Sequence, residues 1–485
     1  MLGFNGQWRL EPDSALYLTI GRNLAAGQGY TYHGHPHRLA FPGPPLLFAA
    51  IFKLSHGQHL LPALVAMLMM GFVTLALTYR LFLLYAGRPT AVLMTFGLGI
   101  SRLFYRYCFE LLSDLPFLLG VMAFLAGYEA VFYRRGVPGG EGDHPRAPAR
   151  WFDWVLLVGG LLVAVMMRPT MWALLAAVVL ATGWSFVRRA DVPRRRWPQV
   201  VIVSTIVAAV VAFSLLDPRH AGGHTMGQYE DALFEAKFSH FGTMLRQTST
   251  EYLPLLFESA VCKAVLGCPI GFGLNAIAGA VVLVLGIGLA RVRPLWGLWV
   301  GMTVAIVLIA VKPLDRYFLE VLPLLVHAWW GGIRWLNLRL PRPWGDRVFL
   351  GLFLLGGTTN VLRTGEFIFE QRHAQFRGYY KEGRYASADG VAKLIHDRVG
   401  RVGWVIAPAK CGRILTFLSN RNVIEAPREA QLDPRRQNVF VLEPLSDPAR
   451  QWLAAAPARL GPQIGPTIQA ARDPDNWRLY QVDPG

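Results

Sequence analysis

The sequence predicts a polytopic α-helical membrane protein with a small α/β domain at its C-terminal end. Of its 485 residues, 53% are hydrophobic and only 16% are charged, and the mean hydropathy is +0.34. A soluble domain cannot bury that much apolar surface, so most of the chain must lie in lipid. Two further patterns carry the prediction: about ten long apolar stretches, and a C-terminal alternation of strands and helices.

The apolar stretches are expected to be helical throughout, because lipid offers no partner for free backbone groups. The ten predicted spans are 60–86, 88–107, 113–133, 151–168, 171–187, 197–216, 271–290, 294–311, 315–335 and 345–362. They define a transmembrane bundle over residues 60–362, which follows a first external segment at 1–59. A linker at 363–385 then leads to the soluble domain at 386–485.

Lys and Arg residues predict how the bundle is oriented. Basic loops such as VRRADVPRRRW follow the third, fifth, seventh and ninth spans, and all of these loops fall on one side if the spans alternate. Basic loops mark the cytoplasmic side. Residues 1–59, the loop 217–270 and the chain after 363 are then extracytoplasmic. This distribution also accounts for the net charge of +17, so nucleic acid is not an expected partner.

Two external segments raise questions of their own. Residues 1–59 must cross the membrane, yet MLGFNGQWRL has neither a basic nor an apolar signal region. We favour an N-terminal helix missing from this sequence, with insertion by the first hairpin as the alternative. The loop 217–270 has helical apolar spacing, which fits surface helices or packing against the bundle. Its Cys262 and Cys268 could form a disulfide or remain unpaired.

The C-terminal domain is predicted from short alternating elements. Residues 386–399 and 410–420 have helical patterns, whereas 403–408, 438–444 and 477–482 are typical of strands. No phosphate-binding Gly-rich loop follows the early strands, so we expect no nucleotide site there.

Acidic residues are scarce in this chain, and several fall at the external face. Glu11 and Asp13 lie in the first external segment, and Asp114 lies at the external start of the third span. Each has a local alternative: Asp13 could cap the helix that follows it, and Asp114 could cap a helix beginning at Leu115-Pro116. Neither alternative explains why the acids share one face of the membrane.

Basic side chains reach the same level of the membrane. These are Arg106, Arg168, Lys312 and Arg316. Ionisable groups at this depth usually face a cavity or one another. The alternatives are snorkelling towards water and a structural ion-pair ladder of Arg102, Arg106 and Glu110. Cations beside external carboxylates are the groups needed to bind a lipid-linked phosphate and to activate a nucleophile.

The run HGHPH at His33 to His37 allows a metal interpretation. Alternating His residues in an extended segment point the same way and could chelate zinc. The neighbouring Gly and Pro favour a solvated loop instead. The sequence therefore predicts no certain cofactor, and a divalent metal stays open.

Several motifs, taken in order, carry a family resemblance. DSALYLTIGRNLAAGQGY, FPGPPLLFAAIF, SDLPFLLG, RPT and DRYFLEVLPLL together resemble bacterial membrane glycosyltransferases of the GT-C fold. Relatives include the protein O-mannosyltransferases, the lipid A aminoarabinose transferase and lipooligosaccharide glycosyltransferases. The resemblance implies an inner-membrane enzyme of the cell envelope whose active site faces the periplasm or exterior. It would transfer a hexosyl or pentosyl group, with inversion, from a polyprenyl-phosphate sugar to a glycan, lipid or protein acceptor.

The same resemblance implies roles for individual residues. Asp13 matches the general base, and Asp114 matches a second external acid that holds the acceptor or organises the site. Arg316 and Tyr317 match a late Arg-Tyr pair that contacts the leaving phosphate. Further candidates for substrate binding are Glu11, Arg106, Arg168 and Lys312.

Two other functional classes remain open. A transporter or flippase of lipid-linked sugars would need charges near mid-membrane and internal repeats, and neither is evident in the sequence. A non-catalytic scaffold in envelope assembly could keep the fold and both acids as helix caps.

Overall fold

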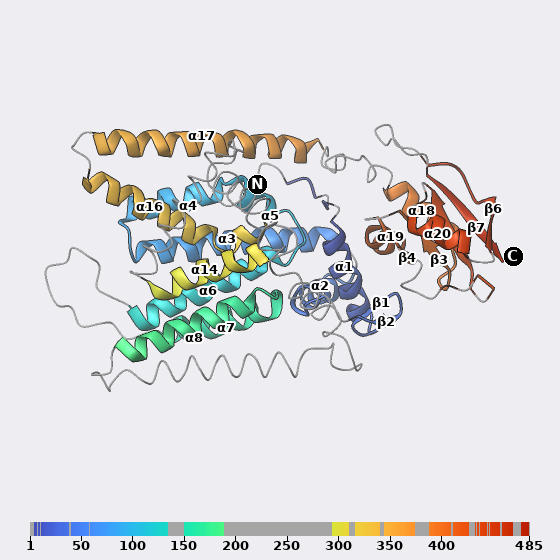
Figure 1. Cartoon of the computed structure of the whole chain (residues 1–485), viewed down its shortest axis with the longest axis horizontal. Coiled ribbons are helices and arrows are strands. Elements are labelled where there is room, and N and C mark those ends of the chain that lie inside the picture. The colour runs from blue at the N-terminus through green and yellow to red at the C-terminus, as the bar shows by residue number, and fades with distance from the viewer. Residues whose placement is uncertain are drawn as a thin grey trace.

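The structure is a computed structural model with a helical body and a C-terminal sheet domain (Figure 1). It describes residues 4–6, 8–9, 11–37, 40–57, 59–133, 150–188, 293–309, 316–339, 344–373, 388–408, 411–425, 432, 434–435, 437–443, 445, 447–455, 458–468 and 477–484. The predicted spans 197–216 and 271–290, the loop 217–270 and Lys312 lie outside these ranges.

The helical body contains most of the described helices. They are α1 (Pro12–Ala25), α2 (Gly43–Leu54), α3 (Leu60–Leu83), α4 (Arg88–Gly99), α5 (Arg102–Tyr107), α6 (Asp114–Tyr133), α7 (Trp151–Met167), α8 (Met171–Arg188), α14 (Pro294–Ile309), α15 (Arg316–Leu319), α16 (Leu322–Arg339) and α17 (Trp344–Arg372). Five of them, α3, α6, α7, α8 and α14, match predicted spans to within a few residues.

Three predicted spans differ from the structure. The span 88–107 is two helices, α4 and α5, and the Ile100 carbonyl near the break accepts a hydrogen bond of 2.7 Å from the Thr364 hydroxyl. The span 315–335 is likewise divided into α15 and α16. The last span, predicted as 345–362, continues in α17 to Arg372. The predicted linker 363–385 therefore begins too early.

The outer helices present apolar side chains to their surroundings. On α3, one face is buried, while Leu61, Val65, Met69 and Phe72 on another face are 41–52% exposed. Both α3 and residues Asp114–Phe132 of α6 are long and apolar enough to cross a bilayer, and α2, α7 and part of α8 are shorter apolar helices. An exposed apolar stripe of this length fits contact with lipid rather than with water.

Helices α6 and α7 approach each other through glycines. A Cβ at Gly120 would lie 2.8 Å from the Ala164 nitrogen, and one at Gly160 would overlap the backbone at Phe124. Small residues at such positions allow two helix backbones to come close in a membrane protein. This contact brings Asp114 at the start of α6 beside Arg168, which follows the end of α7.

The C-terminal domain contains a five-stranded sheet with the order β4-β3-β5-β7-β6. Its elements are α18 (Ala388–Arg398), β3 (Trp404–Ile406), α19 (Gly412–Ser419), β4 (Asn422–Ile424), β5 (Val439–Glu443), α20 (Asp447–Ala455), β6 (Ala458–Gln463) and β7 (Arg478–Pro484). Strand β3 is parallel to β4 and β5, whereas β7 is antiparallel to β5 and β6. The predicted helices and strands correspond to α18, α19, β3, β5 and β7, while β4, β6 and α20 were not predicted.

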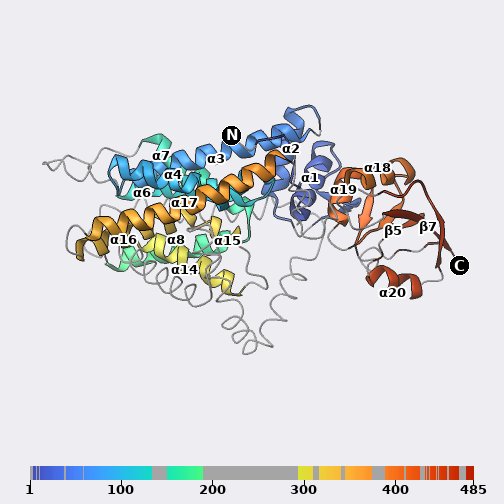
Figure 2. The same cartoon turned by 90° about the horizontal axis from the view of Figure 1, so that it is seen from above.

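The segment that contains α1 and α2 lies between the bundle and this domain (Figures 1 and 2). Helix α1 packs on α2, with Gly21 against Pro45 and Phe48, and on its other side it meets α19. Trp8 contributes an edge-on ring contact to Phe417 with centroids 5.3 Å apart. The C-terminal domain is therefore held against the segment that carries the candidate acids.

The HGHPH run is a hairpin turn and not an extended segment. Strands β1 (Thr31–Tyr32) and β2 (His35–Pro36) pair across His33 and Gly34, whose φ angles are +54° and +76°. Two central residues with positive φ are typical of a type I′ turn. The extended geometry that the metal interpretation assumed is therefore wrong. His33 instead meets the Thr416 hydroxyl at 3.1 Å.

Candidate functional site

Asp13 lies in the first turn of α1. The helix begins at Pro12 with Glu11 as its N-cap, so the expectation that Asp13 caps the helix is wrong. The Ser14 hydroxyl donates to the Glu11 carbonyl at 2.8 Å, and the Trp8 indole N–H donates to Ser14 at 3.0 Å. These contacts fix the start of the helix, whose dipole favours a carboxylate at this end.

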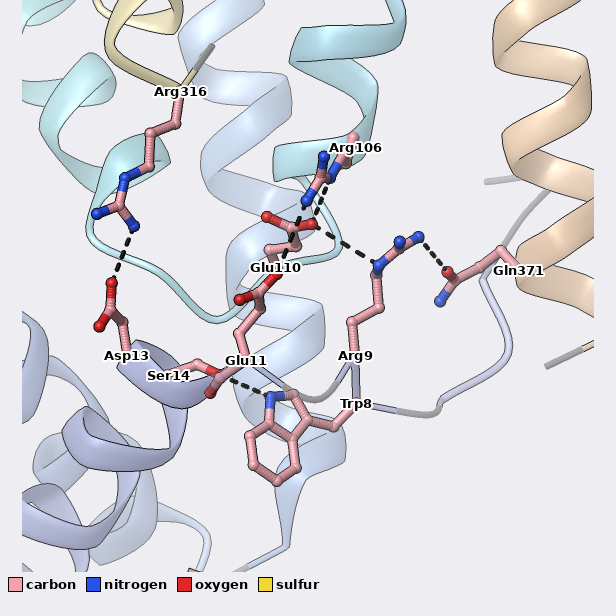
Figure 3. Close-up of polar contacts among 9 residues, drawn as sticks. All are labelled: Trp8, Arg9, Glu11, Asp13, Ser14, Arg106, Glu110, Arg316 and Gln371. Atoms are coloured by element: carbon pink, nitrogen blue, oxygen red, sulfur yellow. Dashed lines mark hydrogen bonds and ion pairs between the residues drawn. The ribbon is translucent and has the colours of Figure 1, made fainter. Parts of the chain in front are cut away.

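The Asp13 carboxylate has a separate arginine on each oxygen. Arg316 Nη1 donates to Oδ2 at 2.9 Å, and Arg413 Nη1 donates to Oδ1 at 3.1 Å. The first pair is drawn in Figure 3. Arg316 comes from α15 in the bundle and Arg413 from α19 in the C-terminal domain. The Asp13 side chain is still 35% exposed, so a bound hydroxyl can reach it.

Asp114 is buried and ion-paired. It begins α6, has 1% of its side chain exposed, and pairs with Arg168 from the α7–α8 turn. Arg168 also reaches Glu320 at 3.2 Å, and the Thr170 hydroxyl donates to Glu320 at 3.1 Å. One buried guanidinium therefore serves two buried carboxylates, which are the groups that most need such a partner.

Tyr317 and Tyr17 connect the Asp13 and Asp114 groups. The Tyr317 ring has the guanidinium carbons of Arg168 and Arg316 at 5.2 and 5.7 Å from its centroid. Tyr17 lies one turn after Asp13 and hydrogen-bonds Ser113 beside Asp114. Burial, with a contribution from the Asp13 charge, raises the pKa of Tyr17 to about 12, so its hydroxyl stays protonated.

The two acids lie in one electrostatic cluster. Arg316 interacts with the charges of both Asp13 and Asp114, and Tyr17 interacts with both as well. Asp13 and Asp114 are about a hundred residues apart in sequence, and Arg316 and Tyr17 connect them in space. The arrangement combines one accessible carboxylate with several fixed guanidinium groups. It can accept a proton and bind an oxyanion in the same place.

A neighbouring network holds the chain just ahead of α1. Arg106 Nε contacts Glu110 at 2.6 Å, and its Nη2 contacts Glu11 at 3.7 Å. Arg9 reaches Glu110 at 3.7 Å and donates to Gln371 of α17 at 3.3 Å (Figure 3). The predicted Arg106–Glu110 rung is therefore present.

Arg102 departs from the predicted ladder. It pairs with Glu366 of α17 at 3.7 Å, so the expected ladder consists of the Arg106–Glu110 pair without Arg102.

The predicted residues thus fall into three groups. Asp13, Asp114, Arg168, Arg316 and Tyr317 come together, Glu11 and Arg106 belong to the adjacent network, and Lys312 lies outside the described residues. Sequence reasoning missed Tyr17, Glu320 and Arg413. The signal for Glu320 was available, since it is a rare acid within the apolar stretch DRYFLEVLPLL. Nothing local to Arg413 indicates a partner 400 residues away.

No metal-ligand cluster is evident in the part of the chain that the structure describes. Within it, no three His, Cys, Asp or Glu side chains are grouped to hold an ion. Cys108 and Cys411 are both buried, and Cys262 and Cys268 fall outside the described ranges.

Comparison with solved structures identifies the architecture. Two structures of ArnT from Cupriavidus metallidurans, one in the apo state and one bound to undecaprenyl phosphate, each superpose with a TM-score of 0.58. The matches cover 99% of this chain and 95% of the ArnT chain, at 15% and 14% sequence identity. The chain has the GT-C fold.

The GT-C fold confirms the expectation from the sequence motifs, and the long apolar helices α3 and α6 fit a membrane-spanning bundle. The count of ten spans stays a prediction, because two of them lie outside the described residues. Known protein-family models do not match the sequence, and curated proteins give no match either. The GT-C assignment therefore rests on three-dimensional similarity.

Proposed function

We propose that this chain is an inner-membrane glycosyltransferase that moves a sugar from a polyprenyl-phosphate-linked donor to an extracytoplasmic acceptor, with inversion. The observation that carries the proposal is the part-exposed Asp13 carboxylate, set among Arg316, Arg413 and Arg168 in a GT-C fold. An ArnT structure with this fold contains undecaprenyl phosphate, which supports a lipid phosphate as the donor carrier.

In this proposal Asp13 is the general base. It takes the proton of an acceptor hydroxyl as that oxygen attacks the anomeric carbon from the face opposite the phosphate. The bond to the phosphate oxygen breaks with its electron pair, so the sugar inverts and the lipid phosphate leaves as an anion. A positioned base typically contributes about 10²–10⁴-fold to such a step. Arg316, with Tyr317 beside it, stabilises the departing phosphate.

Asp114 has a different role because it is buried under Arg168. Its carboxylate is 1% exposed and already paired with Arg168, so an acceptor hydroxyl does not reach it. It holds Arg168 beside Tyr317 and Arg316, which supports the expectation that the second acid organises the site. Glu320 performs the same task from the other side of Arg168.

The Asp13–Arg316 pair also suggests an order of binding. A donor phosphate carries more negative charge than one carboxylate and competes for Arg316. When Arg316 turns to the phosphate, Asp13 Oδ2 is released for the acceptor hydroxyl. The base thus becomes available only once a donor is in place, which limits unproductive reaction with water.

The test uses purified full-length protein with a panel of labelled polyprenyl-phosphate sugars. We expect one donor to be consumed, and Asp13→Asn to lower kcat by at least about 10²-fold. Glu366→Gln is the matched control, since it removes an exposed, ion-paired carboxylate on α17. Failure of the native protein to consume any donor would contradict a transferase, and full activity of Asp13→Asn would contradict its role as base. Movement of lipid-linked sugar across vesicles without transfer would favour the transporter alternative.

A further inference from the structure

A cavity lies where α1, the β1–β2 hairpin and the C-terminal domain meet. Its volume is about 280 Å³, and its walls include Thr19, Arg22 and Asn23 of α1, His33 of the turn, and Thr416 and Arg421 of the C-terminal domain. Both cartoon views place α1 beside α19 at this junction (Figures 1 and 2). It is separate from the cluster around Asp13, which lies at the other end of α1.

The charged side chains that line this cavity are all positive. Arg22, Arg401 and Arg421 line it, and its lining residues in the described structure include no Asp or Glu. Arg421 is held by backbone carbonyls, with bonds of 2.6 Å to Val399 and 2.9 Å to His396. Its charge stays fixed at the wall. A cavity lined by cations alone concentrates anions from solution.

Arg22 is the most informative of the three arginines. It is only 7% exposed; its guanidinium donates to the Phe417 carbonyl at 3.0 Å and lies 5.5 Å from the centroid of the Phe417 ring. Within the described ranges it forms no ion pair with a carboxylate. Burial lowers the pKa of Arg22 to about 10, because its charge lacks the stabilisation that water or an anion would provide. An anionic ligand would supply the missing counter-charge.

The other wall groups suit a carbohydrate. Gln28, Asn420 and Asn422 line the cavity, and their side-chain amides can both donate to and accept from hydroxyls; the Asn23 amide nitrogen already donates to Thr31, which leaves its oxygen as an acceptor. A volume of about 280 Å³ is at the small end of ligand sites, enough for one sugar ring with a charged substituent. A charged polymer such as nucleic acid would not enter it.

The cavity also lies within reach of Asp13. Arg22 follows Asp13 by nine residues, which is about 13 Å along the axis of α1. Helix α19 contributes to both places, because Arg413 contacts Asp13 while Thr416 lines the cavity one turn later. A glycan chain held in the cavity can therefore extend to the carboxylate.

We propose that this cavity binds an acidic sugar residue of the acceptor glycan, carrying a phosphate or a carboxylate. The acceptor part of this inference rests on the proposed transferase function, whereas the binding of an acidic sugar does not. The site is distinct from the one expected for the donor phosphate, which is at Arg316.

Calorimetric titration of the purified full-length protein tests the binding. The probes are glucuronate, glucose 1-phosphate and, as the neutral comparison, glucose. We expect the two acids to bind and glucose not to bind, with the tighter acid indicating which anion the cavity prefers. Arg401→Gln should weaken this binding about tenfold, since a charge-assisted hydrogen bond is lost. Arg401 is exposed, so the substitution should not disturb folding.

Two control variants separate the outcomes. Arg459→Gln removes an exposed arginine of β6 in the same domain and should leave binding unchanged. With glucuronate as the probe, Arg316→Gln should also leave binding unchanged, and loss of glucuronate binding there but not in Arg401→Gln would overturn the proposal. Equal binding of glucose, or no binding of either acid, would overturn it as well. Binding through Arg401 in a protein that consumes no donor would support the acidic-sugar site while contradicting the transferase.

Discussion

Arg168 is the counter-ion of two buried carboxylates, Asp114 and Glu320, and is itself only 6% exposed at its side chain. Breaking a buried ion pair is far more destabilising than lacking one, because a charge is left without a partner. At this single residue the electrostatics of the candidate site and the stability of the bundle depend on the same contacts.

We expect Arg168→Gln to lower the free energy of unfolding by about 3–5 kcal/mol, because it leaves two buried acids unpaired. Glu320→Gln should cost much less, since Asp114 still pairs with Arg168 and Thr170 can still donate to the new amide. Thermal unfolding of the detergent-solubilised variants measures both. Equal losses of unfolding free energy in the two variants would contradict the idea that Arg168 neutralises both Asp114 and Glu320.

The pKa of His33 indicates how the stability of its contact with Thr416 depends on pH. Burial, with the nearby His35 and His37, lowers the pKa of His33 from 6.5 to about 4. The folded state therefore favours the neutral ring. The stabilisation is complete above pH 6.5 and is lost progressively as the pH falls towards 4. For a partly exposed ring this loss is about 1–2 kcal/mol.

His33→Asn should remove this pH dependence, since Asn tolerates the positive φ of the turn and does not titrate. The measurement is thermal unfolding at several pH values between 7 and 4. If native protein and variant lose stability in parallel over that interval, another group is responsible.

Single residues also show what sequence can and cannot provide. Asp13 and Asp114 could be found because charged groups in an apolar chain are few and their side of the membrane follows from the basic loops. Arg413 could not, because its relation to Asp13 depends on how a separate domain docks. The cap interpretation of Asp13 failed for a local reason, since Pro12 began the helix one residue earlier.

At the scale of elements, the α6–α7 contact is the closest helix pairing described above. Gly160 faces α6, and a Cβ there would overlap the backbone at Phe124, whereas a Cβ at the adjacent Gly159 would meet nothing within 4 Å. Position 160 therefore has no room for a side chain, whereas position 159 can hold one.

We expect Gly160→Ala to destabilise the protein by about 1–3 kcal/mol, because the helices must move apart. Gly159→Ala should be neutral or stabilising by up to about 1 kcal/mol, because alanine lowers the entropy lost in forming a helix. Unfolding midpoints of the two variants decide the matter, and similar effects would contradict the close approach of α6 and α7.

Helix ends show a limit of sequence reasoning at this scale. Long apolar runs predicted α3, α6, α7, α8 and α14 well, because their length alone requires a span. The breaks between α4 and α5 and between α15 and α16 were not predicted. A break inside an apolar run is decided by tertiary partners, such as Thr364 at the Ile100 carbonyl, and these are not visible locally.

At the scale of the whole molecule, the C-terminal domain contributes a residue to the candidate site. Arg413 holds Oδ1 of Asp13 from α19, while the Trp8–Phe417 and His33–Thr416 contacts hold the domain in place. The domain is therefore part of the catalytic arrangement that we propose, and not only an attachment to the bundle.

We expect Arg413→Gln to lower the transfer rate about 10- to 100-fold, because a base displaced by about 1 Å aligns poorly with its substrate. The midpoint of thermal unfolding should hardly change, since Arg413 is 43% exposed and such pairs contribute little to stability. Arg459→Gln is the control. Unchanged transfer in Arg413→Gln would show that the domain does not act on Asp13.

The double pairing of Asp13 has a consequence for how its removal is interpreted. Two guanidinium groups, one from the bundle and one from the C-terminal domain, converge on a single anion. Without that anion the two like charges would face each other, at a small cost because both are partly exposed. An acid at this position therefore has a structural use as well as the catalytic one that we propose. Retention of the acid is therefore not, by itself, a sign of an active enzyme.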